Sequence, residues 1–317
     1  MPEPEVRKLV SIVVPFYNEG EGVANFFYAI SDVINAAADC HFEVICVDDG
    51  STDDTLRQLI DLVEKDSRFR VLELSRNFGK EPALTAGIDM AKGDAVIPID
   101  ADLQDPPELI PILIEKWHAG AEVVLARRTD RAADAWLKRL TAEKFYRLHN
   151  RLSQVQIPEN VGDFRLIDRV VVEALKQLPE RQRFMKGLFA WVGFRTSEVE
   201  YARKSRHTGI TKFSGWKLWN FALEGITGYS TIPLKIWTYV GAAGALLTAC
   251  YAAFIVFRTL LQGIDVPGYA SLLVAVLFLG SLQLIGIGVL GEYIGRIYME
   301  TKQRPSYIVR KSYETDP

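Results

Sequence analysis

Ala95-Val-Ile-Pro-Ile-Asp-Ala-Asp-Leu-Gln-Asp-Pro-Pro107 joins a short apolar run to two carboxylates that stand one residue apart. The run is typical of a buried β-strand, and at strand spacing Asp100 and Asp102 would share one face. Oxygen ligands without His or Cys suit a hard cation such as Mg²⁺ or Mn²⁺. Taken alone, such a pair is more often a solvated acidic turn before a helix. The neighbouring segments are therefore needed to distinguish a metal site from such a turn.

Apolar runs and helical patterns alternate on both sides of this motif. Strands are predicted over 9–15, 42–47, 69–74, 95–99 and 122–126. Helices are predicted over 21–37, 52–65, 81–90 and 107–117, the second with a capping box formed by Ser51 and Asp54. This alternation predicts βαβ units and an α/β fold with a mostly parallel sheet. The polar loops after the strands are therefore expected to gather at one edge, where open α/β sheets bind ligands.

Beyond residue 127 the alternation loosens. Further helices are predicted over 136–152, over 169–178 and around Trp191, and an edge strand over 195–201. A strongly basic loop follows this strand.

Composition excludes some classes of function. The 317-residue chain has a formal net charge of −3, which gives no electrostatic case for a nucleic-acid partner. Cys40, Cys46 and Cys250 suggest packing residues rather than a disulfide framework. No apolar signal-peptide core precedes the first strand, so we expect the first domain to stay in the cytosol.

Two long uncharged stretches follow the soluble-looking part of the chain. After Lys235 no charged residue occurs before Arg258, and after Asp265 none occurs before Glu292. Each stretch exceeds the roughly 20 residues that span a bilayer as a helix. The pattern therefore predicts transmembrane helices at about 236–258 and 267–291.

The flanking segments predict how this hairpin lies in a membrane. The Trp-containing segment 213–231 fits an interfacial amphipathic helix, with packing on the soluble domain as the alternative. Lys and Arg residues in the tail favour a cytoplasmic location of both termini, although Arg258 opposes it. Gly291 and Gly295 lie four residues apart, a spacing that favours close helix packing and self-association.

Several predicted strand ends carry polar side chains. These are Tyr17, Asn18 and Glu19 after the first strand, Asp48 and Asp49 after the second, Arg76 to Lys80 after the third, and Asp100, Asp102 and Gln104 after the fourth. An acid-rich edge without a phosphate-binding glycine loop suits recognition of a base and ribose by carboxylates, with a metal ion holding a diphosphate.

The same segments carry a resemblance to a known family. The motifs are Val13-Val-Pro15-x-Tyr17-Asn18-Glu19, Val47-Asp-Asp49-Gly-Ser-Thr-Asp53, Arg76-Asn-Phe-Gly-Lys80, Asp100-Ala-Asp102-Leu-Gln104-Asp-Pro-Pro107 and Asp163-Phe-Arg165-Leu. Together they resemble family 2 glycosyltransferases, and within these the polyprenyl-phosphate glycosyltransferases, which include dolichyl-phosphate mannose synthases. The two C-terminal spans make the chain most similar to the bacterial GtrB-type undecaprenyl-phosphate glucosyltransferases. The resemblance implies a GT-A (Rossmann-like) nucleotide-sugar-binding domain.

The resemblance also implies roles for individual residues. The nucleoside would be contacted by Pro15, Tyr17, Glu19 and Asp48, and the ribose and diphosphate by Asp100 and Ala101. The divalent metal, Mg²⁺ or Mn²⁺, would be held by Asp102 and Gln104, with Asp100 as a further candidate. Asp163 and Asp102 would be the catalytic residues, with Asp163 acting either as a base or by orienting the acceptor. Arg206 and Lys212 would close over the donor diphosphate, and Arg127 would contact the lipid phosphate.

By the same resemblance, the chain is predicted to transfer a hexose to polyprenyl (undecaprenyl) phosphate with inversion, glucose from UDP-glucose being the first choice. Transfer from GDP-mannose, a processive polysaccharide synthase and a non-catalytic nucleotide-sugar sensor are the alternatives. A homotetramer in the inner (plasma) membrane, with the catalytic domain in the cytoplasm, is expected. The implied division is a catalytic domain over 1–212, an interfacial helix over 213–231, a transmembrane hairpin over 232–298 and a cytoplasmic tail over 299–317.

Overall fold

The computed structural model describes residues 7–37, 39–129, 158, 161–181, 183–202, 231–262 and 268–315. The predicted helices over 136–152 and 213–231 lie outside these residues, apart from position 231. Contacts divide the chain into two units, one of residues 1–150, 155–215 and 304–317, the other of residues 151–154 and 216–303. Each unit is described by itself. The C-terminal residues from 304 onward belong to the first unit, with the sheet.

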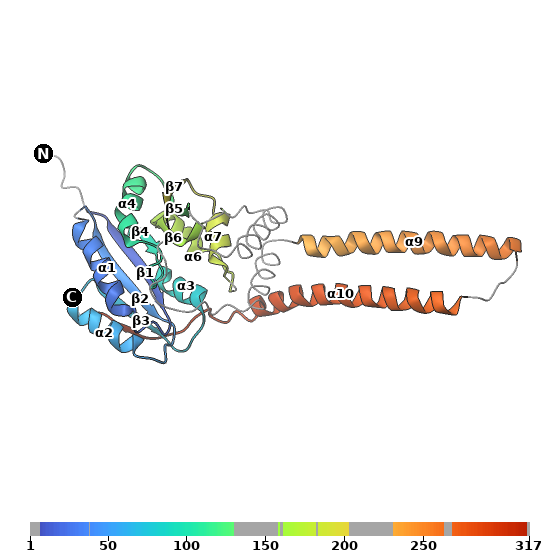
Figure 1. Ribbon diagram of the computed structural model, residues 1–317, viewed down its shortest axis with the longest axis horizontal. Coiled ribbons are helices and arrows are strands. Elements are labelled where there is room, and N and C mark those ends of the chain that lie inside the picture. The colour runs from blue at the N-terminus through green and yellow to red at the C-terminus, as the bar shows by residue number, and fades with distance from the viewer. Residues whose placement is uncertain are drawn as a thin grey trace. The chain divides into compact units, whose positions relative to one another are not determined.

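The first unit is built on a sheet in which the described residues form eight strands, in the order β7-β5-β6-β4-β1-β2-β3-β8 (Figure 1). The strands are β1 (Leu9–Phe16), β2 (His41–Asp48), β3 (Phe69–Leu74), β4 (Ala95–Pro98), β5 (Val123–Arg128), β6 (Val161–Asp168), β7 (Thr196–Tyr201) and β8 (Val309–Tyr313). Strand β1 pairs in parallel with β2 and β4, β2 with β3, and β5 with β7. The pairs β4–β6, β5–β6 and β3–β8 are antiparallel. The predicted α/β class with a mostly parallel sheet is confirmed, and β7 is an edge strand as predicted.

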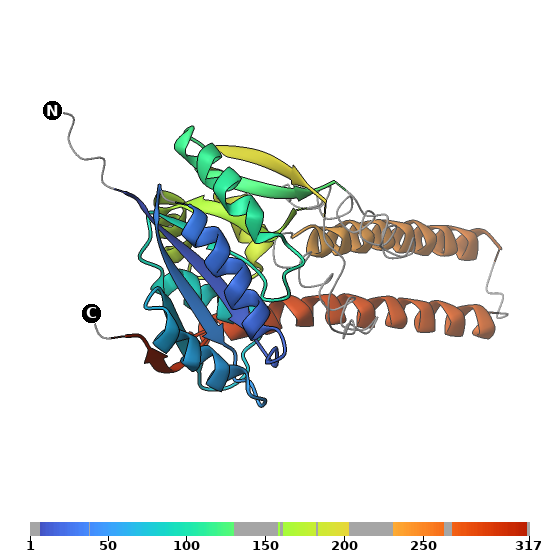
Figure 2. The same cartoon turned by 60° about the vertical axis from the view of Figure 1, so that its left-hand side comes forward.

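Helices cover the sheet on both faces. They are α1 (Val23–Ala36), α2 (Thr55–Lys65), α3 (Lys80–Met90), the 3-10 helix η1 (Pro107–Leu109), α4 (Ile110–His118), α6 (Arg169–Lys176) and α7 (Met185–Trp191). Val10, Ile12 and Val14 of β1 belong to one hydrophobic core together with buried residues of α1, α2 and α4. Figure 2 shows α1 and α2 on the same face of the sheet. Because successive side chains alternate across a strand, Val13 faces the other way, toward α3.

Two local predictions near the ligand-binding edge are wrong. Helix α2 begins at Thr55 rather than residue 52, because the Asp53 carboxylate accepts from the Thr55 amide (3.1 Å) and Ser51 is used elsewhere. Strand β4 ends at Pro98, so Asp100 and Asp102 lie in a turn beyond it. The strand-alternation argument for these two carboxylates therefore does not hold.

The C-terminal segment adds a strand that the sequence analysis did not predict within the tail 299–317. Strand β8 runs antiparallel to β3, and the Ser75 amide donates to the Ile308 carbonyl at 2.9 Å. The buried Glu73 carboxylate receives Arg310 at 3.0 Å and the Tyr313 hydroxyl at 2.9 Å. The tail is thus part of the sheet.

The second unit contains two long helices, α9 (Ile232–Gln262) and α10 (Tyr269–Thr301). Within them, Leu234–Ile255 and Ala275–Thr301 are long and apolar enough to cross a membrane. Gly286 of α10 lies against the Trp237 ring of α9, where an added Cβ would come within 3.4 Å. The helices therefore approach each other closely at this glycine.

Gly87 sets how closely α3 packs on the sheet. A Cβ there would lie 2.2 Å from Val13 Cγ1 and 3.1 Å from Val47 Cγ2. In a helix interior Ala is favoured over Gly by about 1 kcal/mol, but overpacking costs about 1–3 kcal/mol. Because a contact of this closeness lies at the severe end, we expect Gly87→Ala to lower the midpoint of thermal unfolding by several degrees. The partly exposed Met90→Ala on the same helix is the control, and an unchanged midpoint for Gly87→Ala would contradict this packing.

Candidate active site

The loops after β1 and β2 are fastened to each other by side chains. Asn18 adopts a left-handed conformation (φ 53°), and its Oδ1 accepts from the Thr52 amide at 2.8 Å. Its own amide donates to Ser51 Oγ at 3.0 Å, and the Glu19 amide donates to Thr55 Oγ1 at 2.9 Å. These bonds fix the loop that carries the exposed ring of Tyr17, 43% accessible, beside the partly exposed Pro15.

A second set of bonds joins the end of β2 to the start of α3. The Asp49 carboxylate accepts from the amides of Phe78 (2.7 Å) and Gly79 (2.9 Å). Gly50 has a φ of +68°, and an added Cβ would lie 2.5 Å from the backbone of Arg76. Only glycine fits such a close approach at a positive φ. Asp49 is therefore structural: it holds the residues that immediately precede Lys80.

The Asp48 carboxylate is buried, and only one of its two oxygens accepts a hydrogen bond from the described residues. Its side chain is 1% accessible, and Oδ2 accepts from the Ser51 amide at 3.2 Å. Oδ1 is buried and has no hydrogen-bond partner among the described residues. Burial raises the pKa of this carboxyl, against the lowering effect of the Ser51 hydrogen bonds. A buried acceptor of this kind is suited to an N–H donor of a ligand.

Lys80 joins two carboxylates that come from distant parts of the chain. Its Nζ lies 2.7 Å from Asp100 Oδ1 and 2.7 Å from Asp163 Oδ2. The accessible fractions of the side chains are 45% for Lys80, 29% for Asp100 and 13% for Asp163, so the cluster is partly buried and partly accessible to solvent. Asp163 Oδ1 is buried without a hydrogen-bond partner among the described residues. The structure thus brings together the two carboxylates that the sequence analysis assigned to donor binding and catalysis.

The charges around Asp163 decide its ionisation. Burial alone would raise its pKa, but Lys80 and then Lys186 outweigh burial and hold the pKa well below the ordinary range. Burial likewise raises the pKa of Asp100, against the effect of Lys80. For Lys80 itself, burial is outweighed by the two carboxylates, which raise its pKa. At neutral pH Asp163 is therefore an ionised carboxylate beside the Lys80 ammonium.

Two further ionisable residues, Glu81 and Arg165, interact electrostatically with Asp163 of this cluster. Glu81 accepts from the Met185 amide at 3.1 Å, and burial together with the Asp163 charge raises its pKa to about 7. Arg165 is buried over the Phe189 ring and donates to the Gly162 carbonyl at 2.6 Å. Burial lowers the pKa of its guanidinium to about 10. Sequence reasoning missed the roles of Lys80 and Glu81, because only pairing in three dimensions reveals their partners.

The turn after β4 holds the predicted metal ligands. Asp102 Oδ1 accepts from the Gln104 amide at 3.1 Å, and Leu103 between them has a φ of 53°, rare for a bulky residue. Gln104 is buried, as is Ala101. Beyond them the buried Asp105 accepts from Arg128 at 3.2 Å and from the Tyr201 hydroxyl, which anchors the turn to β5 and β7.

The oxygen ligands of this turn fit a metal ion that is held by only one or two protein side chains. Among the described residues, no three His, Cys, Asp or Glu side chains are grouped as metal ligands. Asp102 and Gln104 offer side-chain oxygens from one strained turn, and Mg²⁺ commonly takes only one or two protein ligands, with water and phosphates completing its shell. Asp100 is ion-paired with Lys80, so its predicted role as a metal ligand would require that pair to open.

The remaining predicted residues lie apart from the cluster or outside the described residues. Arg127 forms an ion pair with Glu198 at 3.0 Å, and both side chains are partly exposed. Its predicted contact with a lipid phosphate stays a prediction. Arg206 and Lys212 fall in the segment 203–230, which is outside the described residues.

Comparison with known proteins agrees with this geometry. Residues 11–176 match Glycosyl transferase family 2, and residues 232–297 match the GtrB C-terminal hairpin. The chain therefore belongs to glycosyl transferase family 2 and is a glycosyltransferase, which confirms the predicted resemblance. It carries in addition the hairpin that defines the GtrB type.

Similar proteins match over nearly the whole chain. It is 55% identical over 308 residues to the SfII prophage-derived bactoprenol glucosyl transferase of Shigella flexneri, covering 97% of this chain and 99% of that protein. It is 54% identical over 300 residues to the uncharacterized glycosyltransferase sll0501 of Synechocystis (95% and 94% covered). It is 54% identical over 302 residues to the prophage bactoprenol glucosyl transferase homolog of Escherichia coli K12 (95% and 98% covered).

The raised pKa of Glu81 makes the stability of the fold depend on pH. Between the model-compound value of 4.5 and about 7, the folded state keeps a proton that the unfolded state has lost, so the free energy of unfolding falls as pH rises. Gln imitates the protonated acid. The measurement is the thermal unfolding midpoint of Glu81→Gln and of the wild type at each pH. We therefore expect the difference, variant minus wild type, to increase from pH 5 to pH 8. The exposed Glu64→Gln should show no such trend, and a difference independent of pH would contradict the raised pKa.

Proposed function

We propose that this enzyme transfers a glucosyl residue from UDP-glucose to bactoprenol (undecaprenyl) phosphate at the cytoplasmic face of the membrane. The observation that carries the proposal is the Asp100–Lys80–Asp163 cluster at the edge of the sheet where β1, β2 and β4 end. The choice of sugar and acceptor rests on relatives such as the SfII protein, whose name states bactoprenol glucosyl transfer.

The loops after β1 and β2 suit the nucleoside. Asp48 has a buried, unpartnered oxygen that can accept from an N–H of a base, while Tyr17 offers an exposed ring for stacking. Pro15 and Glu19 flank this ring. Asp100 and Ala101 follow at the end of β4 and would line the ribose and diphosphate.

A divalent cation, Mg²⁺ or Mn²⁺, would be held by Asp102 and Gln104 and would offset the charge that develops on the leaving diphosphate. Lys80 contributes a second positive charge near the same position. Arg206 and Lys212 are proposed to add to this charge from the basic loop. With the ion bound, the negative charge on the donor would be opposed by both the cation and Lys80.

Asp163 is proposed to orient the acceptor rather than to act as a base. Its lowered pKa keeps it ionised at neutral pH and makes it a weak proton acceptor. A lipid phosphate is already ionised at this pH and needs little deprotonation. Its oxygen would attack C1 of the sugar while the bond to the nucleoside diphosphate breaks. Such a single displacement inverts the configuration at C1.

The hairpin of α9 and α10 is proposed to anchor the enzyme in the membrane, with the catalytic domain and both termini in the cytoplasm. Both helices contain stretches long and apolar enough to span a bilayer. Gly288, Gly291 and Gly295 have open space within 4 Å of an added Cβ in a single chain. This open space would allow close packing of the helix against further copies, and we propose a homotetramer assembled through it.

The test is transfer of radiolabelled glucose from UDP-glucose to undecaprenyl phosphate by the purified full chain. We expect label in the lipid phase with Mg²⁺ or Mn²⁺, and none with a chelator. Asp102→Ala should reduce the rate at least about 100-fold, whereas the exposed Asp61→Ala should not change it. Label from GDP-mannose alone would contradict the choice of donor, and no transfer from any donor despite nucleotide binding would favour a sensor.

The role of Lys80 is tested separately in the same assay. Lys80→Gln leaves Asp100 and Asp163 without their shared cation, so we expect kcat to fall by about 10- to 100-fold. The pKa of Asp163 should also rise, so the remaining activity should decline at a higher pH on acidification than in the wild type. Lys65→Gln, an exposed lysine on α2, is the matched control. An unchanged pH profile would show that Lys80 does not govern the ionisation of Asp163.

A further inference from the structure

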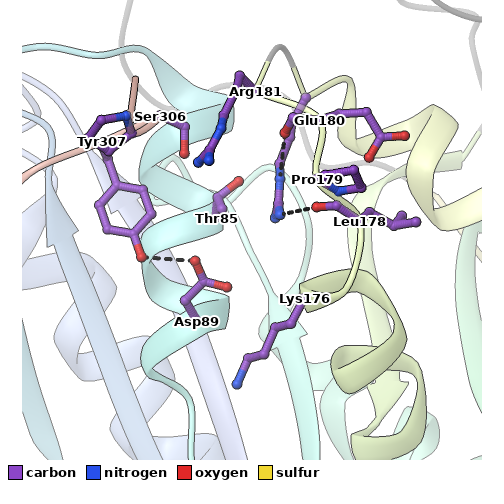
Figure 3. A pocket seen from close by; sticks show the side chains of 11 residues that line it. Thr85, Asp89, Lys176, Leu178, Pro179, Glu180, Arg181, Ser306 and Tyr307 are labelled. Atoms are coloured by element: carbon purple, nitrogen blue, oxygen red, sulfur yellow. Dashed lines mark hydrogen bonds between the residues drawn. The ribbon is translucent and has the colours of Figure 1, made fainter. Parts of the chain in front are cut away.

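The described residues form a polar cavity that does not include the residues of the catalytic cluster. It has a volume of about 460 Å³ and is lined by α3, by the segment after α6 and by the residues that precede β8 (Figure 3). None of the residues assigned above to donor, metal or acceptor lines it. A cavity of this size is large enough for a small ligand.

The cavity is rich in positive charge. Lys176, Arg181 and Arg183 line it, against two carboxylates, Asp89 and Glu180. Asp89 is occupied by the Tyr307 hydroxyl, which donates to it at 2.9 Å (Figure 3). The guanidinium of Arg183 is held by the carbonyls of Leu178 (3.0 Å) and Glu180 (3.3 Å). The guanidinium is therefore positioned by neutral carbonyl groups, which do not cancel its positive charge in the cavity.

Lys176 forms only a weak ion pair outside the cavity. Its Nζ lies 3.4 Å from the half-exposed Glu173 carboxylate, a surface pair of the kind that contributes little. Ser306 adds a hydroxyl to the lining. Fixed cations and a hydroxyl together match the oxygens of a phosphate group, with which Arg and Lys form strong hydrogen bonds.

The chain also brings one wall of the cavity close to a predicted membrane helix. Pro305, Ser306 and Tyr307 follow Thr301, the last residue of the candidate span, by only four to six positions. Four extended residues reach at most about 14 Å. If α10 crosses the bilayer, this wall lies within reach of the lipid headgroups, and basic pockets at that level bind anionic lipids.

We propose that this cavity binds the phosphodiester headgroup of an anionic membrane phospholipid. The lipid phosphate would contact Lys176, Arg181 and Arg183, and Ser306 would donate to one of its oxygens. The site is linked to the catalytic cluster by α3, which carries Lys80 at its first residue and Thr85 and Asp89 in the cavity wall. An occupied cavity would hold α3 and the tail together beside the active site.

The test is the shift of the thermal unfolding midpoint of the detergent-purified full chain on titration with dioctanoyl phosphatidylglycerol. We expect a saturable stabilisation that dioctanoyl phosphatidylcholine and inorganic phosphate do not give at the same concentrations. Equal shifts with phosphatidylcholine would show a nonspecific lipid effect, and equal shifts with inorganic phosphate would show an anion site without lipid preference. Either result overturns the proposal.

Variants locate the effect. Lys176→Gln with Arg181→Gln should raise the apparent dissociation constant for phosphatidylglycerol at least about tenfold. Ser306→Glu should do the same, because it adds a negative charge to the cavity and leaves the hydrogen bonds of Arg183 to Leu178 and Glu180 in place. Arg57→Gln with Lys65→Gln, two exposed cations on α2, is the matched control. Unchanged phosphatidylglycerol binding in both cavity variants would refute the site. The assay contains neither sugar donor nor lipid acceptor, so such a result would not bear on the proposed transfer reaction.

Discussion

The ammonium of Lys80, placed between Asp100 and Asp163, is the interaction on which the active site depends. Two carboxylates held this close together would repel each other, and one would take up a proton unless a cation lay between them. Lys80 occupies that position because Asp49 binds the amides of Phe78 and Gly79 and so fixes where α3 begins. A structural carboxylate at the end of β2 therefore helps to set the charge state of Asp163 on β6, the residue proposed to orient the acceptor.

The direction of β6 explains how Asp163 reaches this edge. Parallel strands β1, β2 and β4 bring their carboxyl ends together, whereas β6 runs antiparallel to β4. Its amino-terminal part therefore lies at the ligand edge. The register pairs Ala95 with Asp168 and Val96 with Ile167, so the start of β6 lies toward the edge at which β4 ends, and there Lys80 pairs with both Asp100 and Asp163. One antiparallel strand in a mainly parallel sheet thus carries Asp163, the proposed acceptor-orienting residue, to the edge at which the parallel strands end.

Sequence alone was sufficient where a pattern has a local cause. The alternation of apolar runs predicted the parallel strands and placed Asp48 and Asp100 at their carboxyl ends. The sequence-based prediction failed where the cause is distant. Helix α2 begins only at Thr55 because Ser51 Oγ accepts a hydrogen bond from the Asn18 amide and so does not cap the helix earlier. The end of β4 at Pro98 could not be predicted from an apolar run that continues to Ile99. The partners of Lys80 lie 20 and 83 residues away, and no spacing rule connects them.

The eighth strand shows why the tail belongs to the catalytic domain. Glu73 is only 7% accessible, and a buried carboxylate without partners is costly. Its partners, Arg310 and Tyr313, both come from β8, so the edge of the sheet at β3 is completed only by residues that follow the hairpin. In register, Glu73 lies beside Asp48, whose pKa it helps to raise. Loss of β8 would therefore change the electrostatics around Asp48, the proposed nucleoside contact, as well as the stability of the sheet. Because β8 follows α10 directly in the chain, the segment that completes this edge of the sheet is covalently continuous with the hairpin of long apolar helices.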